Sequence, residues 1–252
     1  MGRSKKRQPL DSFRDSLDDA DALIIFARAF QNQRSRRMRK ELRNRVGDAL
    51  KVPARDRESM DCIENGQVFL VFRDASDLGK DRFTDLRPLL RQSIVAGCAA
   101  LETYLADKTM ERIGAALKAD AIPKRLRSIP LTLGHWSDIE REYSRRTWGI
   151  RAIVEEAVRE QASTAPNKVG ELLSMIGVTD WTRKVDSARN VPRGTTEGHL
   201  TTLTDRRNRV AHSADRVGQG RANLEIEEAE AFLAQIRDVA EAIDVVVGDH
   251  AH

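Results

Sequence analysis

Apolar residues recur at intervals of three or four along most of the 252-residue chain, with polar residues between them. This spacing places apolar side chains on one face of an α-helix rather than on one face of a strand. Helices are therefore predicted at 10–50, 81–118, 137–161, 166–176, 195–217 and 226–247. Pro166 suits the first turn of its helix and Gly177 suits its C-cap. The pattern predicts an all-α helical bundle.

The start of the helix at 137–161 has a local signal of its own. Ser137 and Glu140 have the spacing of a capping box, in which two side chains satisfy free backbone N–H groups at a helix start. His135 and Trp136 precede this pair and follow a short loop. We expect both of these side chains to pack in that loop.

Residues 54–80 give the weakest pattern. Asn65-Gly66 indicates a turn, and the apolar run at 67–72 fits either a short strand or one buried helical turn. We divide the chain into a disordered basic tail at 1–9, a basic helical N-terminal extension at 10–78, and a helical domain at 79–252.

Composition supports a helical protein that does not cross a membrane. Aromatic residues are only 5% of the chain and charged residues 33%, whereas strands draw on aromatic and β-branched residues. No apolar run approaches the roughly 20 residues that a membrane span needs, and no apolar segment of a secretory signal follows the basic start. Cys62 and Cys98 lie far apart, which excludes a disulfide framework and a Cys-based zinc site. A cytoplasmic location is expected.

Positive charge is concentrated near the start of the chain. Residues 1–51 hold 14 Lys and Arg against 7 Asp and Glu, whereas the rest holds 29 against 32. The densest cluster consists of Arg34, Arg36, Arg37, Arg39, Lys40, Arg43 and Arg45. Arginine binds phosphate in a bidentate manner, so this stretch is a candidate RNA-binding surface. The alternative interpretation is a solvated helix face.

The candidate for chemistry is a string late in the helix at 195–217. Asn208 and His212 are four residues apart, so their side chains can meet on one helix face, and Arg207 directly precedes Asn208. Histidine moves protons near neutral pH, and arginine holds phosphate oxygens, so neither step needs a metal. The spacing alone is weak evidence for a catalytic site, because Arg193 and His199 fit a similar pattern. A histidine near the C-terminus of a helix can also be placed there for its favourable interaction with the helix dipole.

The string Arg207-Asn208-x-x-x-His212 resembles the signature of the HEPN superfamily, in the RiboL-PSP-HEPN-like branch. The segment 91–105, with Ala100-Leu101-Glu102 at its centre, resembles an early helix of that branch. The segment 226–247 resembles its closing helix. The resemblance covers residues from about 80 to 247 and does not reach the N-terminal extension.

This resemblance implies a HEPN-like helical bundle, usually a homodimer, that cleaves RNA without a metal or other cofactor. The RNA 2′-hydroxyl is the nucleophile, and the motifs of two chains face each other across a cleft. Many members are toxins or effectors of toxin–antitoxin and antiphage systems. It implies that Arg207 binds the scissile phosphate, His212 is the general acid/base and Asn208 positions them. Glu102 and Arg206 are supporting residues, and an arginine near the motif is the expected partner of Glu102.

The expected partners are RNA, a second copy of the chain, and an antitoxin or other defence-system protein, with no membrane. Two alternatives remain open. One is a non-catalytic HEPN protein that binds RNA or a protein through the same helix, because a fold alone does not establish activity. The other is a helical nucleic-acid-binding protein that uses the Arg34–Arg45 stretch.

Overall fold

A computed structural model describes residues 7–31, 40–49, 51–59, 61–64, 69–72, 86–218 and 220–249. These residues are predominantly helical, which confirms the predicted all-α class. The helices are α1 (Pro9–Gln31), α2 (Lys40–Ala49), the 3₁₀ helix η1 (Ala54–Ser59), α4 (Arg87–Ala116), α5 (Lys124–Arg127), α6 (Leu133–Glu142), α7 (Arg146–Gln161), α8 (Pro166–Met175), α9 (Trp181–Ala188), α10 (Thr195–Ser213) and α11 (Ile226–Asp249). The short strands are β1 (Asp61–Glu64), β2 (Phe69–Phe72), β3 (Arg216–Val217) and β4 (Gly220–Arg221).

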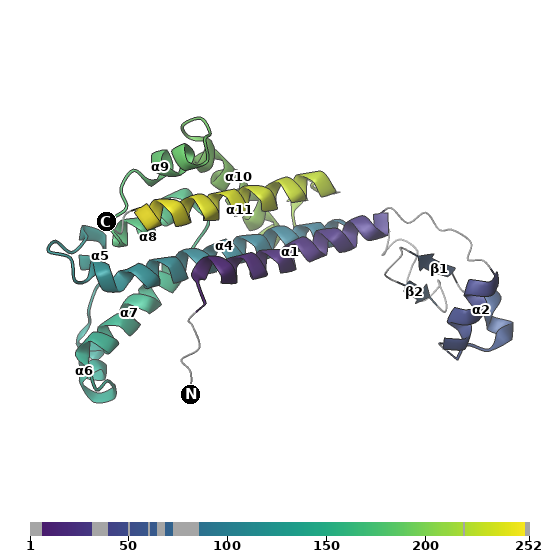
Figure 1. Cartoon of the computed structure of the whole chain (residues 1–252), viewed down its shortest axis with the longest axis horizontal. Helices are drawn as coiled ribbons and strands as arrows, with labels where there is room; N and C mark the ends of the chain where they lie inside the picture. Colours follow the sequence, from purple (N-terminus) through teal and green to yellow (C-terminus); the bar gives the residue numbers. More distant parts are fainter. Residues whose placement is uncertain are drawn as a thin grey trace.

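Three long helices form the centre of the bundle. Helices α1, α4 and α11 run alongside one another (Figure 1) and bury Leu17, Leu101 and Ile236 completely. The approach of α11 to α4 is close at Gly97, where a Cβ atom would lie 2.5 Å from Leu233 Cδ2. The absence of a side chain at Gly97 therefore lets the two helices pack tightly.

Helix α1 contributes fully to this core although it lies within the predicted N-terminal extension. Phe13, Leu17 and Ile24 are at most 2% exposed. At its edges, Arg28 Nη2 lies 2.7 Å from Glu230 on α11. Residues 1–6 of the predicted tail lie outside the described residues, and Pro9 is already the first residue of α1. The apolar residues whose spacing predicted this helix are therefore the ones that α1 buries against the bundle.

The remaining helices cover other sides of this centre. Helices α7, α8 and α10 pack against α4, and α9 packs against α11. Leu173 of α8 and Leu203 of α10 are both buried in the common core. The bounds of α8 agree with the predicted signals, because Pro166 is its first residue and Gly177 follows it with φ +86°.

The helix predicted at 137–161 is divided in two, and its predicted capping box is wrong. Helix α6 begins earlier, where the Thr132 hydroxyl accepts from the backbone N–H of His135 at 3.1 Å. The backbone N–H of Thr132 in turn donates to His135 Nδ1 at 3.3 Å. Tyr143 and Arg145 are extended, which ends α6 and begins α7. The satisfied cap at Thr132 leaves Ser137 inside the helix.

For the apolar run at 67–72, the sequence left a strand and a helical turn open, and the structure shows a strand, β2, in the chain between α1 and α4. Strands β1 and β2 pair antiparallel, with Cys62 opposite Val71. The predicted Asn65-Gly66 turn lies outside the described residues. Figure 1 draws α2 and these strands beyond the end of α1. Across the described ranges, every helix is too short or too polar to cross a bilayer.

Candidate functional site

The motif residues lie on the C-terminal half of α10, which the bundle anchors from its first turn. Two backbone N–H groups there, of Gly194 and Thr196, donate to the Asp186 carboxylate at 2.7 and 2.9 Å. Burial alone would raise the pKa of Asp186, but these hydrogen bonds and the nearby Arg189 lower it. The Asp186 side chain of α9 therefore caps the N-terminus of α10 in place of a side chain from the N-cap residue itself.

Arg207 points toward α4 and meets the predicted carboxylate. Its Nη2 lies 3.7 Å from Glu102 Oε2, and its Nη1 donates to Asn208 Oδ1 at 3.2 Å. The Glu102 side chain is 20% exposed. Burial raises the pKa of Glu102, and Arg207 and the backbone N–H of Thr164 offset part of that rise. The expected pairing of Glu102 with an arginine of the motif is therefore confirmed.

His212 lies on a different side of the helix from Arg207. Five residues correspond to a rotation of about 140° around the α-helix axis. His212 is exposed in the last turn of α10, and within the described chain its ring has no hydrogen-bond partner. Asn208 makes no hydrogen bond to His212, and its amide oxygen accepts from Arg207. The site thus holds one anchored guanidinium and one imidazole that faces solvent.

A buried ionic cluster fixes the chain directly after the motif. Asp215 is fully buried, and its Oδ2 lies 3.0 Å from both Arg91 Nε and Arg206 Nη2. The same arginines donate at 2.8 Å to the backbone carbonyls of Ala222 and Asn223. Arg206, predicted as a supporting residue, is 6% exposed, so it faces this cluster rather than the solvent.

The turn at Ala214 and Asp215, which follows α10, has unusual backbone dihedral angles. Ala214 and Asp215 both have positive φ angles, 50° and 60°, in the left-handed region that non-glycine residues rarely adopt. The N–H of Asp215 donates to the carbonyl of Arg209 at 2.9 Å. The N–H of Ala222 donates to the carbonyl of Asp215 at 2.8 Å, beside the β3–β4 pair. The end of α10, which carries His212, is therefore tied to α4 and to the following hairpin.

Sequence reasoning missed Arg91 and Asp215. Asp215 is separated from Arg91 by 124 positions, and only folding brings them together. The one available signal was Arg91 itself, a charged residue next to the apolar Leu90 of a predicted core face. A charge in that position requires a buried partner, but the sequence does not identify it.

Cys98 lies one turn before Glu102 on α4 and is fully buried. Burial raises the pKa of its thiol to about 12; the charge of Glu102 adds to this, and Arg207 opposes it. A thiol with such a pKa stays protonated at neutral pH, so Cys98 is not a nucleophile.

The predicted RNA-binding stretch falls mostly outside the described residues. This applies to Arg34, Arg36, Arg37 and Arg39. Lys40, Arg43 and Arg45 belong to α2, which packs against η1. The interaction of this stretch with RNA stays a prediction.

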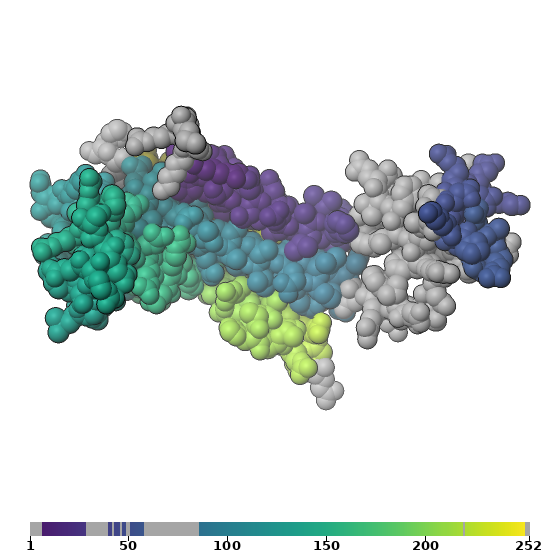
Figure 2. Space-filling model, turned by 90° about the horizontal axis from the view of Figure 1, so that it is seen from below, coloured from purple at the N-terminus to yellow at the C-terminus, as the bar shows by residue number. Residues whose placement is uncertain are grey.

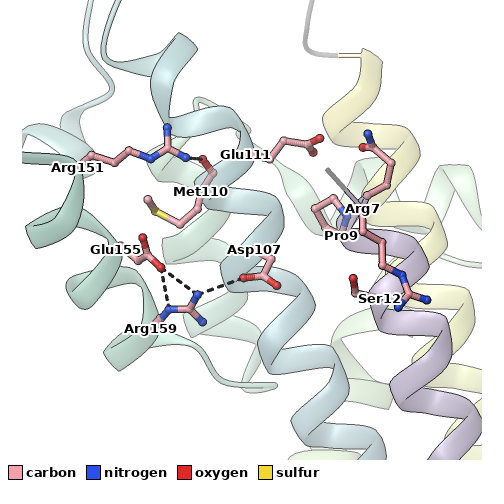
Figure 3. A pocket seen from close by; sticks show the side chains of 10 residues that line it. Arg7, Pro9, Ser12, Asp107, Met110, Glu111, Arg151, Glu155 and Arg159 are labelled. Carbon is pink, nitrogen blue, oxygen red and sulfur yellow. Dashed lines mark hydrogen bonds and ion pairs between the residues drawn. The ribbon is translucent and has the colours of Figure 1, made fainter. Parts of the chain in front are cut away.

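A cavity of about 280 Å³ lies between α1, α4 and α7 (Figure 3), and the motif residues do not line it. Three arginines and three carboxylates are among its lining residues. Arg159 Nη2 lies 3.4 Å from Asp107 and 3.0 Å from Glu155, and Arg151 donates to the carbonyl of Met110 at 3.1 Å. Because its positive and negative side chains are equal in number, the lining of this cavity does not indicate the charge of a ligand. In the part of the chain that the structure describes, no three His, Cys, Asp or Glu side chains gather as a metal-binding group.

Among known proteins, no family model, no curated protein and no solved structure matches the chain.

Proposed function

We propose that this protein is a metal-independent endoribonuclease of the HEPN type, with His212 as general acid/base and Arg207 binding the scissile phosphate. The observation that supports this most is the pair of unlike groups on α10. Glu102 on α4 anchors Arg207, and His212 is exposed on the same helix five residues later. An anchored cation and an accessible imidazole are the two groups that phosphodiester cleavage through the 2′-hydroxyl needs.

In the proposed reaction, the RNA 2′-oxygen attacks the adjacent phosphorus and the bond to the 5′-oxygen breaks. The attacking hydroxyl loses one proton, and the leaving oxygen gains one. The products are a 2′,3′-cyclic phosphate and a 5′-hydroxyl. Arg207 stabilises the charge on the phosphate oxygens, and Asn208 holds the guanidinium through their 3.2 Å hydrogen bond. His212 accepts the proton of the 2′-hydroxyl and, once protonated, returns a proton to the 5′-oxygen, and we propose a homodimer in which each site combines Arg207 of one chain with His212 of the other.

The first experiment is cleavage of a labelled single-stranded RNA by the full chain in EDTA. His212→Ala and Arg207→Ala should each lower the rate by at least about 100-fold, the range for losing a general acid/base or a charge-stabilising donor. Arg183→Ala is the matched control, because this exposed arginine of α9 pairs with Asp180 at 3.7 Å and should leave the rate unchanged. Cleavage that needs added Mg²⁺, or products with 3′-hydroxyl ends, would contradict the proposal.

The dimer is tested by mixing two inactive variants. If each site takes Arg207 from one chain and His212 from the other, a heterodimer of the two variants contains one intact site. Random mixing should then restore about a quarter of the activity, because half of the dimers are mixed and each has one of two sites. A monomeric mass at micromolar concentration, or no recovery, would exclude shared sites.

We further propose a role as a toxin or effector in a bacterial toxin–antitoxin or antiphage system, with an antitoxin as partner. This rests on the resemblance of the Arg207–His212 string. Expression in bacteria should arrest growth, and His212→Ala should relieve the arrest while keeping the fold.

A non-catalytic RNA- or protein-binding module is the second candidate. It is favoured by the His212 ring, which lacks an orienting hydrogen bond among the described residues, whereas catalytic histidines usually have one. RNA binding without cleavage by the parent protein would select this function.

A further inference from the structure

Large aromatic side chains are concentrated on the outside of the α6–α7 hairpin. The chain contains three Trp and two Tyr residues. Trp136, Tyr143 and Trp148 lie within this hairpin and are 46%, 37% and 55% exposed. The other two, Tyr104 and Trp181, are buried at 1% and 9%. The expectation that Trp136 packs in a loop is therefore wrong.

Trp136 and Trp148 are exposed because the inner side of the hairpin is filled by Ile139 and by the edge of the Tyr143 ring, whose Cδ2 would lie 3.1 Å from a Cβ atom at Gly149. Ile139 of α6 is 1% exposed and packs on Gly149 of α7, where a Cβ atom would lie only 2.6 Å from Ile139 Cγ1. Val154 and Val158 bury the next turns of α7 against the bundle. Helix α6 packs on α7 and projects from the rest of the molecule (Figure 1). Among the described elements, the main packing partner of α6 is α7, and the outer face of the hairpin keeps its two indoles exposed.

Two consecutive arginines connect the exposed indoles. The Arg145 guanidinium carbon lies 5.2 Å from the ring centroid of Trp148. The Arg146 guanidinium carbon lies 5.2 Å from that of Trp136. We call Trp136, Tyr143, Arg145, Arg146 and Trp148 the Trp–Arg surface. It combines flat rings with cations that already stack on them.

Around the turn of this hairpin, residues 137–148 hold three arginines and three carboxylates, so the charges balance in number but are paired unevenly. The three carboxylates, Asp138, Glu140 and Glu142, lie 3.0 to 3.3 Å from the guanidinium groups of Arg141 or Arg146. Arg145 has no carboxylate partner among the residues that the structure describes, and its guanidinium stacks on Trp148. The surface thus offers π-faces for bases and a guanidinium group that can contact phosphate.

We propose that the Trp–Arg surface binds single-stranded RNA. This proposal rests on the proposed function, because it takes RNA as the substrate of the α10 motif. Unpaired bases stack on aromatic rings, whereas the rings of a duplex base pair are already stacked and cannot be reached. The surface therefore selects unpaired RNA, which is also the flexible form that cleavage through the 2′-hydroxyl requires.

The α6–α7 hairpin and the end of α10 are visible from the same side of the molecule (Figure 2). Figure 2 shows the α6–α7 hairpin in teal and the C-terminal end of α10 with the β3–β4 turn in lime, both reaching the face turned to the viewer. A strand bound at the hairpin can continue along this face toward α10. The bundle would then hold the strand at one place and cleave it at another.

The test measures binding of a fluorescein-labelled 12-nucleotide oligouridylate to the full chain carrying His212→Ala, so that cleavage does not interfere. Trp136→Ala combined with Trp148→Ala should weaken binding by roughly tenfold or more, the effect of losing base stacking. Trp136→Phe with Trp148→Phe keeps the rings and should restore most of the affinity. Val245→Ala, at an exposed apolar residue of α11, is the matched control and should have no effect.

Two further readouts separate stacking from a change in the fold. RNA should quench the tryptophan fluorescence of the parent, and the double alanine variant, which keeps only the buried Trp181, should lose that quenching. Arg145→Ala should reduce the slope of log affinity against log salt by about one, as for one lost phosphate contact. A duplex RNA of the same length should bind more weakly than the single strand.

An affinity and quenching that are unchanged by the double alanine substitution would overturn the proposal. Loss of self-association or of protein binding with RNA affinity intact would do the same, and would assign the surface to a protein partner. These outcomes are distinct from failure of the proposed function. A protein that binds oligouridylate through Trp136 and Trp148 but never cleaves RNA would refute only the nuclease.

Discussion

Replacing Asp215 by alanine should be among the most damaging single changes in this protein. The substitution removes the one carboxylate that lies 3.0 Å from both Arg91 and Arg206, whose side chains are 4% and 8% exposed. Arg91 then has no carboxylate partner among the described residues and Arg206 keeps only Glu228 at 3.9 Å; breaking a buried ion pair in this way costs about 3–5 kcal/mol in comparable cases. Alanine at φ +60° adds roughly 1 kcal/mol, because a left-handed conformation suits aspartate better than alanine. Since domains unfold with about 5–15 kcal/mol, this loss is a large share of the total.

The assay is urea unfolding followed by circular dichroism, with the midpoint compared at constant slope. Asp215→Asn tolerates the same backbone and can still accept hydrogen bonds, so it should lose less than Asp215→Ala. Asp138→Ala is the surface control: Asp138 meets Arg141 at 3.0 Å with both side chains more than half exposed, and its loss should cost under about 1 kcal/mol. The reasoning is refuted if Asp215→Ala costs no more than Asp138→Ala.

Gly149→Ala should destabilise the chain by about 1–2 kcal/mol, because overpacking against Ile139 outweighs the better helix propensity of alanine. Gly198→Ala on α10, where a Cβ atom meets nothing within 4 Å, should instead stabilise by up to about 1 kcal/mol, and thermal melts of the pair decide between these signs. Burial raises the pKa of Glu102 above its ordinary 4.5, so at a pH between that value and the raised pKa the folded chain binds more protons than the unfolded chain. This contribution to stability is present at low pH and is lost as the pH rises through the raised pKa. Glu102→Gln should therefore flatten the dependence of the urea midpoint as the pH rises above the ordinary pKa of 4.5, and an unchanged profile would contradict the argument.

The sequence by itself determined the features that depend on neighbours along the chain. The recurrence of apolar residues every three or four positions predicted α8, α10 and α11 close to their observed bounds. Pro166 and Gly177 marked the ends of α8 because the proline ring and a positive φ act on the backbone locally. The pairing of Glu102 with an arginine of the motif was also foreseeable, since a carboxylate on an apolar helix needs a counter-charge.

Only the tertiary structure decided which of several local choices prevailed. A capping box at Ser137 and one at Thr132 both fit the local sequence, and the structure uses the one at Thr132. The exposure of Trp136 follows from the α6–α7 hairpin, because its inner side is already filled by Ile139.

The Asp215 cluster is the clearest case of a feature that no local pattern contains. Its two arginines come from α4 and α10, and its carboxylate comes from a turn whose backbone is left-handed. Each of these residues alone would be expected on the surface, since a single buried charge is costly. The bundle buries all three because Asp215 pairs with both arginines, Glu228 lies 3.9 Å from Arg206, and both arginines donate to backbone carbonyls. This happens only once helices far apart in the sequence have packed together.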